Sequence, residues 1–147
     1  ASQVLILGSM PSPKSREIGF YYGHPQNRFW KVLARVFEQP EPRSVQEKAD
    51  FCHSQHIALW DVLQRCDIDG ASDSSIKNEK VNDIGIILNS APVKAIFITG
   101  KKAYDIYRRK CQYDVPVFCL PSTSPANCRI GADELAREYS LIKEFVK

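Results

Sequence analysis

Residues 4–30 read VLILGSMPSPKSREIGFYYGHPQNRFW, an apolar run followed by a long segment that leads into an aromatic-rich helix. The run at residues 4–7 predicts a buried strand, because a parallel strand covered on both faces is apolar at every position. Residues 9–26 contain two Gly, three Pro and three Ser, which is typical of a loop. Open α/β sheets bind ligands where strands end at their carboxyl edge. The stretch therefore predicts an α/β sheet whose binding site includes this front loop.

The rest of the chain alternates apolar runs with stretches that have helical spacing. The apolar runs predict strands at residues 3–7, 57–63, 93–99 and 115–120. Helical spacing predicts helices at residues 27–38, 44–55, 84–90, from 100 onward and at 132–146. Strands that alternate with helices favour parallel pairing, so we expect a three-layer α/β/α sandwich around a central four-stranded, mainly parallel sheet. No repeat or linker divides the chain, and residues 1–147 are expected to form a single domain.

Two local signals add detail to this prediction. Ser44 is followed three residues later by Glu47, a capping box that opens the helix at residues 44–55. Residues 67–83 are polar and lack periodicity, so they predict a long loop, and long loops in compact domains are often functional. Asn82 or Asp83 is expected to cap the short helix that follows.

Composition narrows the class of protein. The chain is 44% hydrophobic and 25% charged, as in globular proteins, and no window approaches the length of a membrane helix. A net charge of +3 permits nucleic-acid binding without requiring it. Five cysteines without CxxC spacing argue against a disulfide framework and favour a reducing compartment, so we expect a cytoplasmic protein. His53 and His56 lack a third ligand nearby in sequence, and no metal or other cofactor is expected.

A second loop follows the last predicted strand. Residues 121–127 read PSTSPAN, with serines flanked by prolines. In a parallel sheet this rear loop opens on the same edge as the front loop, so the two can face one cleft. Its hydroxyl and N–H groups suit contacts to phosphate, which position a protein on DNA without reading its sequence. The alternative is a polar turn whose serines cap the final helix.

The two loops together resemble those of the uracil-DNA glycosylase superfamily. The front loop reads GSxPS followed by YYGHPxNRFW, which is most similar to the branch that removes hypoxanthine from deoxyinosine in DNA. The rear loop occupies the place of the HPSPLS or NPSGLS motif, with Ser122 and Ser124 in the serine positions. The resemblance covers nearly the whole chain; the front-loop motif is highly specific, and the rear-loop motif taken alone is weak.

The resemblance implies the catalytic groups. Relatives often carry Asn or Asp at the position of Met10, and a thioether cannot replace that function. Asn27, in the HPxN segment, is then the candidate that orients water or stabilises charge, because an amide can both accept and donate. It could equally cap the helix of residues 27–38. His24 is the second catalytic candidate, to supply positive charge or a hydrogen bond to the leaving purine, and the alternative is an ordinary loop histidine.

The resemblance also implies how a flipped nucleotide is held. Tyr22 aligns with the residue that stacks on the base, and backbone groups at Gly8, Ser9 and Met10 are expected to bind it. Further candidates are expected to contact the DNA backbone or to fill the gap in the duplex: Ser12, Ser15, Ser122, Ser124, Asn127 and Arg129. Leu120 stands where relatives carry His or Asn, so the base contact of that residue is not transferred to this chain.

The resulting functional hypothesis is a monofunctional DNA glycosylase. It would flip a deaminated base, hypoxanthine first, out of double-stranded DNA and hydrolyse its N-glycosidic bond, acting as a monomer without a membrane partner. The alternatives are a mismatch-specific enzyme that removes uracil or thymine opposite guanine, and a DNA-binding relative that has lost catalysis. A serine hydrolase is disfavoured because no GxSxG elbow is present. With DNA as its substrate, the protein would lie at the nucleoid of a bacterial or archaeal cell.

Overall fold

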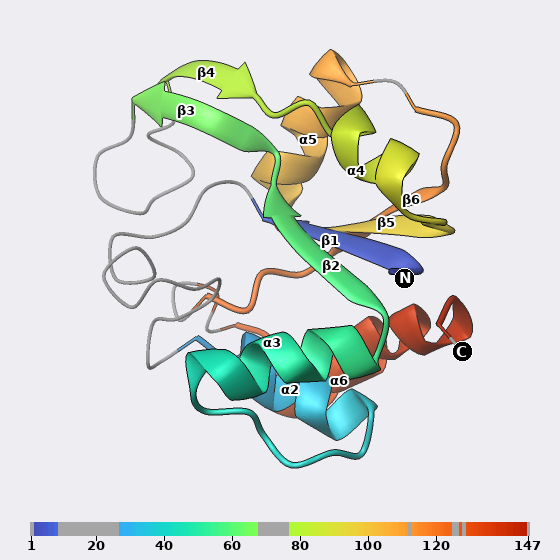
Figure 1. Cartoon of the computed structure of the whole chain (residues 1–147). Helices are drawn as coiled ribbons and strands as arrows, with labels where there is room; N and C mark the ends of the chain where they lie inside the picture. The colour runs from blue at the N-terminus through green and yellow to red at the C-terminus, as the bar shows by residue number, and fades with distance from the viewer. Residues whose placement is uncertain are drawn as a thin grey trace.

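A four-stranded sheet lies at the centre of the computed structural model, which describes residues 2–8, 27–67, 77–111, 113–124, 127 and 129–146 (Figure 1). Its strands, in the spatial order β2-β1-β5-β6, are β2 (Ile57–Asp61), β1 (Val4–Gly8), β5 (Ala95–Thr99) and β6 (Val117–Leu120). All neighbours pair in parallel. The predicted parallel sheet is confirmed, with the apolar runs at its two inner strands.

Helices cover both faces of the sheet, as predicted. One face is covered by α2 (Phe29–Val36), α3 (Val45–Ser54) and α6 (Ala132–Tyr139), which continues into the 3-10 helix η2 (Ser140–Glu144). The other face is covered by α4 (Gly85–Ser90) and α5 (Lys101–Lys110) (Figure 1). The three-layer α/β/α sandwich is therefore confirmed. None of the helices in the described ranges is long and apolar enough to cross a membrane.

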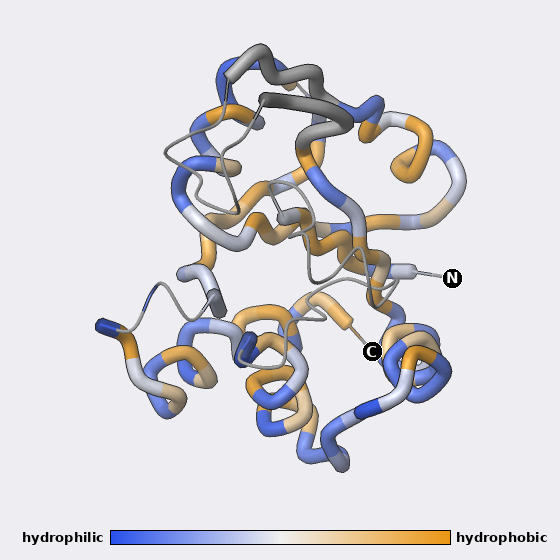
Figure 2. The backbone as a smooth tube through the Cα atoms, turned by 90° about the vertical axis from the view of Figure 1, so that its left-hand side faces the viewer, coloured by the Kyte–Doolittle hydropathy of each residue, from blue (hydrophilic) through white to orange (hydrophobic). Residues whose placement is uncertain are grey.

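Two hydrophobic cores result from the alternation of side chains along the inner strands. Ile6 and Phe97 point into the core with α2 and α6, whereas Leu5, Leu7 and Ile98 point into the core with α5. Each of these side chains is fully buried. Figure 2 shows hydrophobic residues running through the central strands, with hydrophilic stretches on the outer helices and loops. The run at residues 4–7 is continuously apolar because a helical layer covers each face.

The predicted helix start at Ser44 is confirmed in atomic detail. The Glu47 N–H donates to Ser44 Oγ at 3.0 Å, and the Ser44 N–H donates to Glu47 Oε1 at 3.1 Å. The hydrogen bond from the Ser44 backbone N–H holds the pKa of the Glu47 carboxyl below its usual value. The cap expected from Asn82 or Asp83 is not formed at the short helix α4, whose N-cap residue is Ile84 and which has no side-chain cap. Asp83 Oδ1 instead accepts from the N–H of Gly85, the first residue of the helix, at 3.1 Å.

The prediction of an unbroken loop at residues 67–83 is wrong. Strand β4 (Lys77–Val81) lies within it and pairs antiparallel with β3 (Leu63–Asp67), so that Leu63 faces Val81 and Asp67 faces Lys77. The predicted strand 57–63 accordingly ends at Asp61, and a new strand starts two residues later. The sequence KNEKV has no apolar alternation, so periodicity does not predict this strand.

Candidate active site

The candidate site lies at the carboxyl edge of the sheet, where β1 and β5 are neighbours. From β1 the chain passes to β2 on one side, and from β5 it passes to β6 on the other, so the strand order reverses between them. Such a switch point is where open α/β sheets bind ligands. Of the buried polar residues in the described chain, all but Lys48 lie near this edge: Asp61, Thr99 and Thr123. These buried polar residues lie at the carboxyl edge, where the sequence analysis expects the site.

Gly8, a predicted base-binding residue, is the last residue of β1 and is buried. Its carbonyl oxygen accepts from the Val62 N–H at 2.7 Å, and it pairs in register with Asp61 at the end of β2. Gly8 therefore fixes the point from which the front loop leaves the sheet. Its role in binding a base stays a prediction.

Asn27 stands two residues before α2, whose N-cap residue is Arg28, and is half-buried. Its Oδ1 accepts from the Phe29 N–H at 2.9 Å and from the Thr123 hydroxyl at 2.7 Å. The first contact satisfies the N–H of the first residue of the helix. Asn27 is nevertheless not the N-cap expected from the sequence, because Arg28 holds that position and no side chain caps the helix there. The second contact ties Asn27 to the rear loop. The structure thus brings the proposed catalytic amide of the front segment against the rear loop, at the edge where both were expected to meet.

The rear loop is organised by its own polar side chains. Ser122 Oγ accepts from the Ser124 N–H at 3.1 Å, and the Asn127 side-chain amide donates to the Ser122 carbonyl at 2.9 Å. The Asn127 N–H also donates to the Ser124 carbonyl at 2.9 Å. These contacts support the turn interpretation of the serines, while leaving the DNA contact of Ser122, Ser124 and Asn127 a prediction. Arg129 is exposed, which suits a residue that reaches toward DNA.

Arg28, which the sequence analysis did not single out, joins the two parts of the site. Its backbone N–H donates to the Thr123 carbonyl at 3.1 Å. Its guanidinium donates through Nη1 to the Ile130 carbonyl at 2.6 Å and through Nη2 to the Asn127 carbonyl at 2.8 Å. No motif signals this role, because both carbonyls come from residues about a hundred positions later in the chain. The hydrogen bonds of Arg28 and Asn27 together attach the rear loop to the start of α2.

Replacing Arg28 with alanine should lower the free energy of unfolding by about 1–3 kcal/mol, because hydrogen bonds from a charged donor to backbone carbonyls are lost. Urea denaturation measures the change. The matched variant Arg28→Lys keeps the charge but cannot span both carbonyls in the same way, so it should recover at most about half of the loss. Full recovery in Arg28→Lys would show that charge, rather than the two-carbonyl clamp, stabilises this region.

Comparison with known proteins agrees with this arrangement. The sequence model of the uracil DNA glycosylase superfamily matches residues 1–142. The chain belongs to this superfamily. It is 34% identical over 132 residues to a hypoxanthine DNA glycosylase of Methanosarcina barkeri, covering 87% of this chain and 82% of the relative. It is 34% identical over 134 residues to a hypoxanthine DNA glycosylase of Methanosarcina acetivorans, covering 88% and 84%.

The likeness extends to three dimensions. A solution NMR structure described as a candidate uracil DNA glycosylase of Methanosarcina acetivorans superposes with a TM-score of 0.77 at 28% identity, covering 97% of this chain and 91% of the other. The membership inferred from the front and rear loops is confirmed by these matches. The superfamily fold therefore spans the chain from β1 to η2.

Leu120 stands where the superfamily motif carries His or Asn. The side chain is 2% exposed and belongs to the core that contains α2 and α6. Its carbonyl accepts from the N–H of Gly100, whose positive φ of 100° favours glycine. Because the Leu120 side chain is apolar and packs inside the protein, it offers no polar group to a ligand.

Six predicted site residues lie outside the described residues: Ser9, Met10, Ser12, Ser15, Tyr22 and His24. The rest of the proposed site is placed by the structure at one sheet edge. Lys101 and Lys102 also lie there, exposed at the start of α5 directly after β5, and sequence reasoning did not single them out. Their charge suits the phosphate backbone of DNA.

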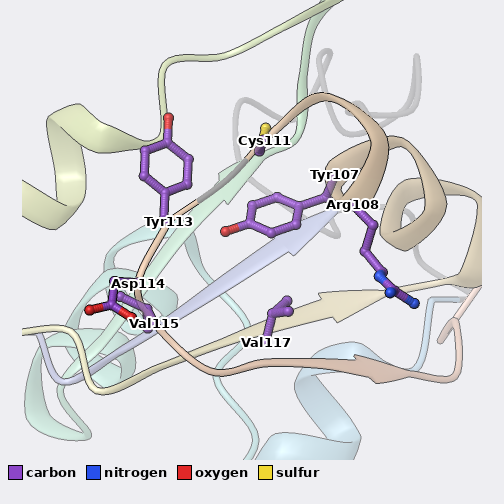
Figure 3. Close-up of a pocket in the computed structure, with 7 residues that line it drawn as sticks. All are labelled: Tyr107, Arg108, Cys111, Tyr113, Asp114, Val115 and Val117. Atoms are coloured by element: carbon purple, nitrogen blue, oxygen red, sulfur yellow. The ribbon is translucent and has the colours of Figure 1, made fainter.

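A pocket of about 490 Å³ lies away from this edge, between the end of α5 and the segment that enters β6 (Figure 3). Tyr107, Tyr113 and Val117 are among its lining residues. Burial raises the pKa of the Tyr107 phenol to about 12. Since β6 begins here and the candidate site lies where β6 ends, this pocket is separate from the candidate site.

The described residues hold no group of three or more His, Cys, Asp or Glu side chains that could bind a metal ion. His53 lies in α3, whereas His56 lies beyond its end with a positive φ of 59°, where the chain turns into β2. The two histidines considered in the sequence therefore do not share a helix.

Proposed function

We propose that this chain is a DNA glycosylase that hydrolyses the N-glycosidic bond of hypoxanthine in deoxyinosine and leaves an abasic site. The single observation that carries the proposal is the anchored Asn27 amide at the switch point of a uracil DNA glycosylase fold. The two relatives named hypoxanthine DNA glycosylase support this choice of base.

The chemistry follows from what the site offers. A base inside a duplex is out of reach, so the nucleotide must be flipped out of the stack at a cost of a few kcal/mol. Breaking the N-glycosidic bond then places negative charge on the departing purine, and preorganised donors stabilise it. Asn27 is the proposed catalytic residue, with His24 as a second group and Tyr22 stacking on the base. Backbone groups at Gly8, Ser9 and Met10 complete the base pocket.

Double-stranded DNA is the proposed partner, bound by a monomer. Ser12 and Ser15 from the front loop and Ser122 and Ser124 from the rear loop would contact phosphates. Exposed Arg129, beside Asn127, would reach into the gap that the flipped nucleotide leaves. We place the enzyme where the chromosome lies, at the nucleoid in the cytoplasm of a bacterial or archaeal cell.

An excision assay on matched duplexes tests the proposal. Duplexes with one inosine, one uracil opposite guanine, or no lesion are incubated with excess protein, and the abasic sites are cleaved with hot alkali. We expect strand breaks at inosine that appear only after alkali treatment, because hydrolysis of the N-glycosidic bond leaves the sugar-phosphate backbone intact. Breaks only at uracil would favour the mismatch-specific alternative.

Leu120 favours a second candidate, a DNA-binding relative without catalysis, because a residue that relatives use for the base is here part of the core. Binding to an inosine duplex without excision of any base would support it. Release of hypoxanthine at rates well above those of buffer would exclude it.

A further inference from the structure

The Thr123 side chain has one hydrogen-bonding role that the motif comparison does not explain. The residue is 1% exposed, although the serines on either side of it are half-buried. Its hydroxyl bonds to Asn27 Oδ1 at 2.7 Å, and its carbonyl accepts from the Arg28 N–H at 3.1 Å. A buried hydroxyl is costly unless it is hydrogen-bonded, so the partner of this one fixes where the side chain can lie. That partner is the proposed catalytic amide.

The direction of each hydrogen bond at Asn27 follows from its chemistry. The Phe29 N–H can only donate, so the amide atom that faces it is the oxygen. An amide oxygen can only accept, so the Thr123 hydroxyl donates to it. Two donors thus occupy the two lone pairs of Oδ1. Within the part of the chain that the structure describes, the Nδ2 group has no partner.

We propose that Thr123 is a positioning residue: its hydroxyl engages the Asn27 oxygen, so that the amide meets the flipped nucleotide through its NH2 group, as a hydrogen-bond donor. The inference rests on the proposed function and deepens it. A water molecule about to attack needs an acceptor, and Oδ1 has no lone pair left for that task. A donor suits the departing base, whose ring nitrogens and oxygen gain negative charge as the bond to the sugar breaks.

Single-turnover excision of inosine tests the role of Thr123. Thr123→Val removes the hydroxyl at nearly constant volume and should slow excision about tenfold, which is about 1.4 kcal/mol in the activation barrier. Affinity for the duplex should stay the same, since the residue is buried. Thr123→Ser restores a hydroxyl and should recover most of the rate. A Thr123→Val rate equal to that of the parent protein would overturn the proposal.

Two variants of Asn27 test the donor role. Asn27→Asp keeps an oxygen for the Phe29 N–H and the Thr123 hydroxyl, but it presents a second oxygen where the amide presents NH2. We expect Asn27→Asp to be as slow as Asn27→Ala. Activity near that of the parent protein would mean that Asn27 acts as an acceptor, for example for water, and would overturn the donor assignment. In the Asn27→Ala background, Thr123→Val should have no further effect on the rate.

A double-mutant cycle with Asn27→Ala, Thr123→Val and the double variant measures the Thr123–Asn27 contact without DNA. The free energy of unfolding of each variant is obtained by urea denaturation. We expect the two changes to be coupled, and additive shifts in the midpoint would show that the hydrogen bond is absent in solution. If the parent protein excises neither hypoxanthine nor uracil while the cycle shows coupling, the proposed function fails and the contact stands. If the parent protein excises hypoxanthine and Thr123→Val does so equally fast, the positioning role fails and the function stands.

Discussion

Replacing Asn27 with alanine should slow hypoxanthine excision by about 100- to 1000-fold, the usual effect of removing one preorganised donor from a catalytic site. DNA affinity should change little, because phosphate contacts supply most of it. Single-turnover excision from an inosine duplex measures the rate, and fluorescence anisotropy measures the affinity.

Two controls make this result interpretable. Asn89→Ala removes the same side chain at an exposed position of α4 and should leave the rate within about twofold of the parent protein, as for surface changes away from a site. Asn27→Asp retains the contact to the Phe29 N–H and therefore separates catalysis from the loss of this hydrogen bond at the start of α2. A rate for Asn27→Ala within a few-fold of the parent would remove Asn27 from the mechanism.

Phe29→Ala should lower the free energy of unfolding by about 3–5 kcal/mol, because it opens a cavity in the core beneath the site. The Phe29 ring is fully buried and packs edge-on against Trp30 at 5.1 Å and Tyr139 at 6.5 Å between ring centres. It therefore joins α2 to α6. The expected loss is a large share of the total stability of an ordinary domain.

Urea denaturation of Phe29→Ala measures the loss as a lower midpoint with an unchanged slope. Ile86→Ala provides the control, since the Ile86 side chain is 61% exposed and its removal should change stability by less than about 0.5 kcal/mol. Equal losses in the two variants would mean that the layer of α2 and α6 does not depend on this ring.

The parts of the fold that were predicted correctly are those that hydrophobic burial determines. The apolar residues 4–7 and 95–98 are covered on both faces, so their pattern predicts a central parallel strand. The β3–β4 ribbon was missed because its KNEKV strand lacks apolar alternation. The last helix was predicted to residue 146, but its α-helical part ends at Tyr139 and continues as a 3-10 turn. Periodicity does not distinguish these two kinds of turn at a helix end.

The candidate site was predicted residue by residue only where a motif carries it. Asn27 is a candidate on this ground, whereas the sequence favours the serines on either side of Thr123 over Thr123 itself. Thr123 is buried whereas the two serines are half-buried, and the sequence PSTSPAN has no periodicity that would show which of its side chains points inward. Arg28 was missed because its carbonyl partners lie 99 and 102 residues away in sequence. Contacts between loops arise from tertiary packing, which a single sequence does not show.

The Thr123–Asn27 hydrogen bond joins residues 96 positions apart. During translation Asn27 leaves the ribosome long before Thr123, so a nascent chain carries the proposed catalytic amide without the hydroxyl proposed to orient it. The two meet only when β6 has added to the edge of the sheet and the loop after it has folded back. Excision competence is thus expected to be the last property that the molecule acquires, and incomplete translation products would leave the genome intact.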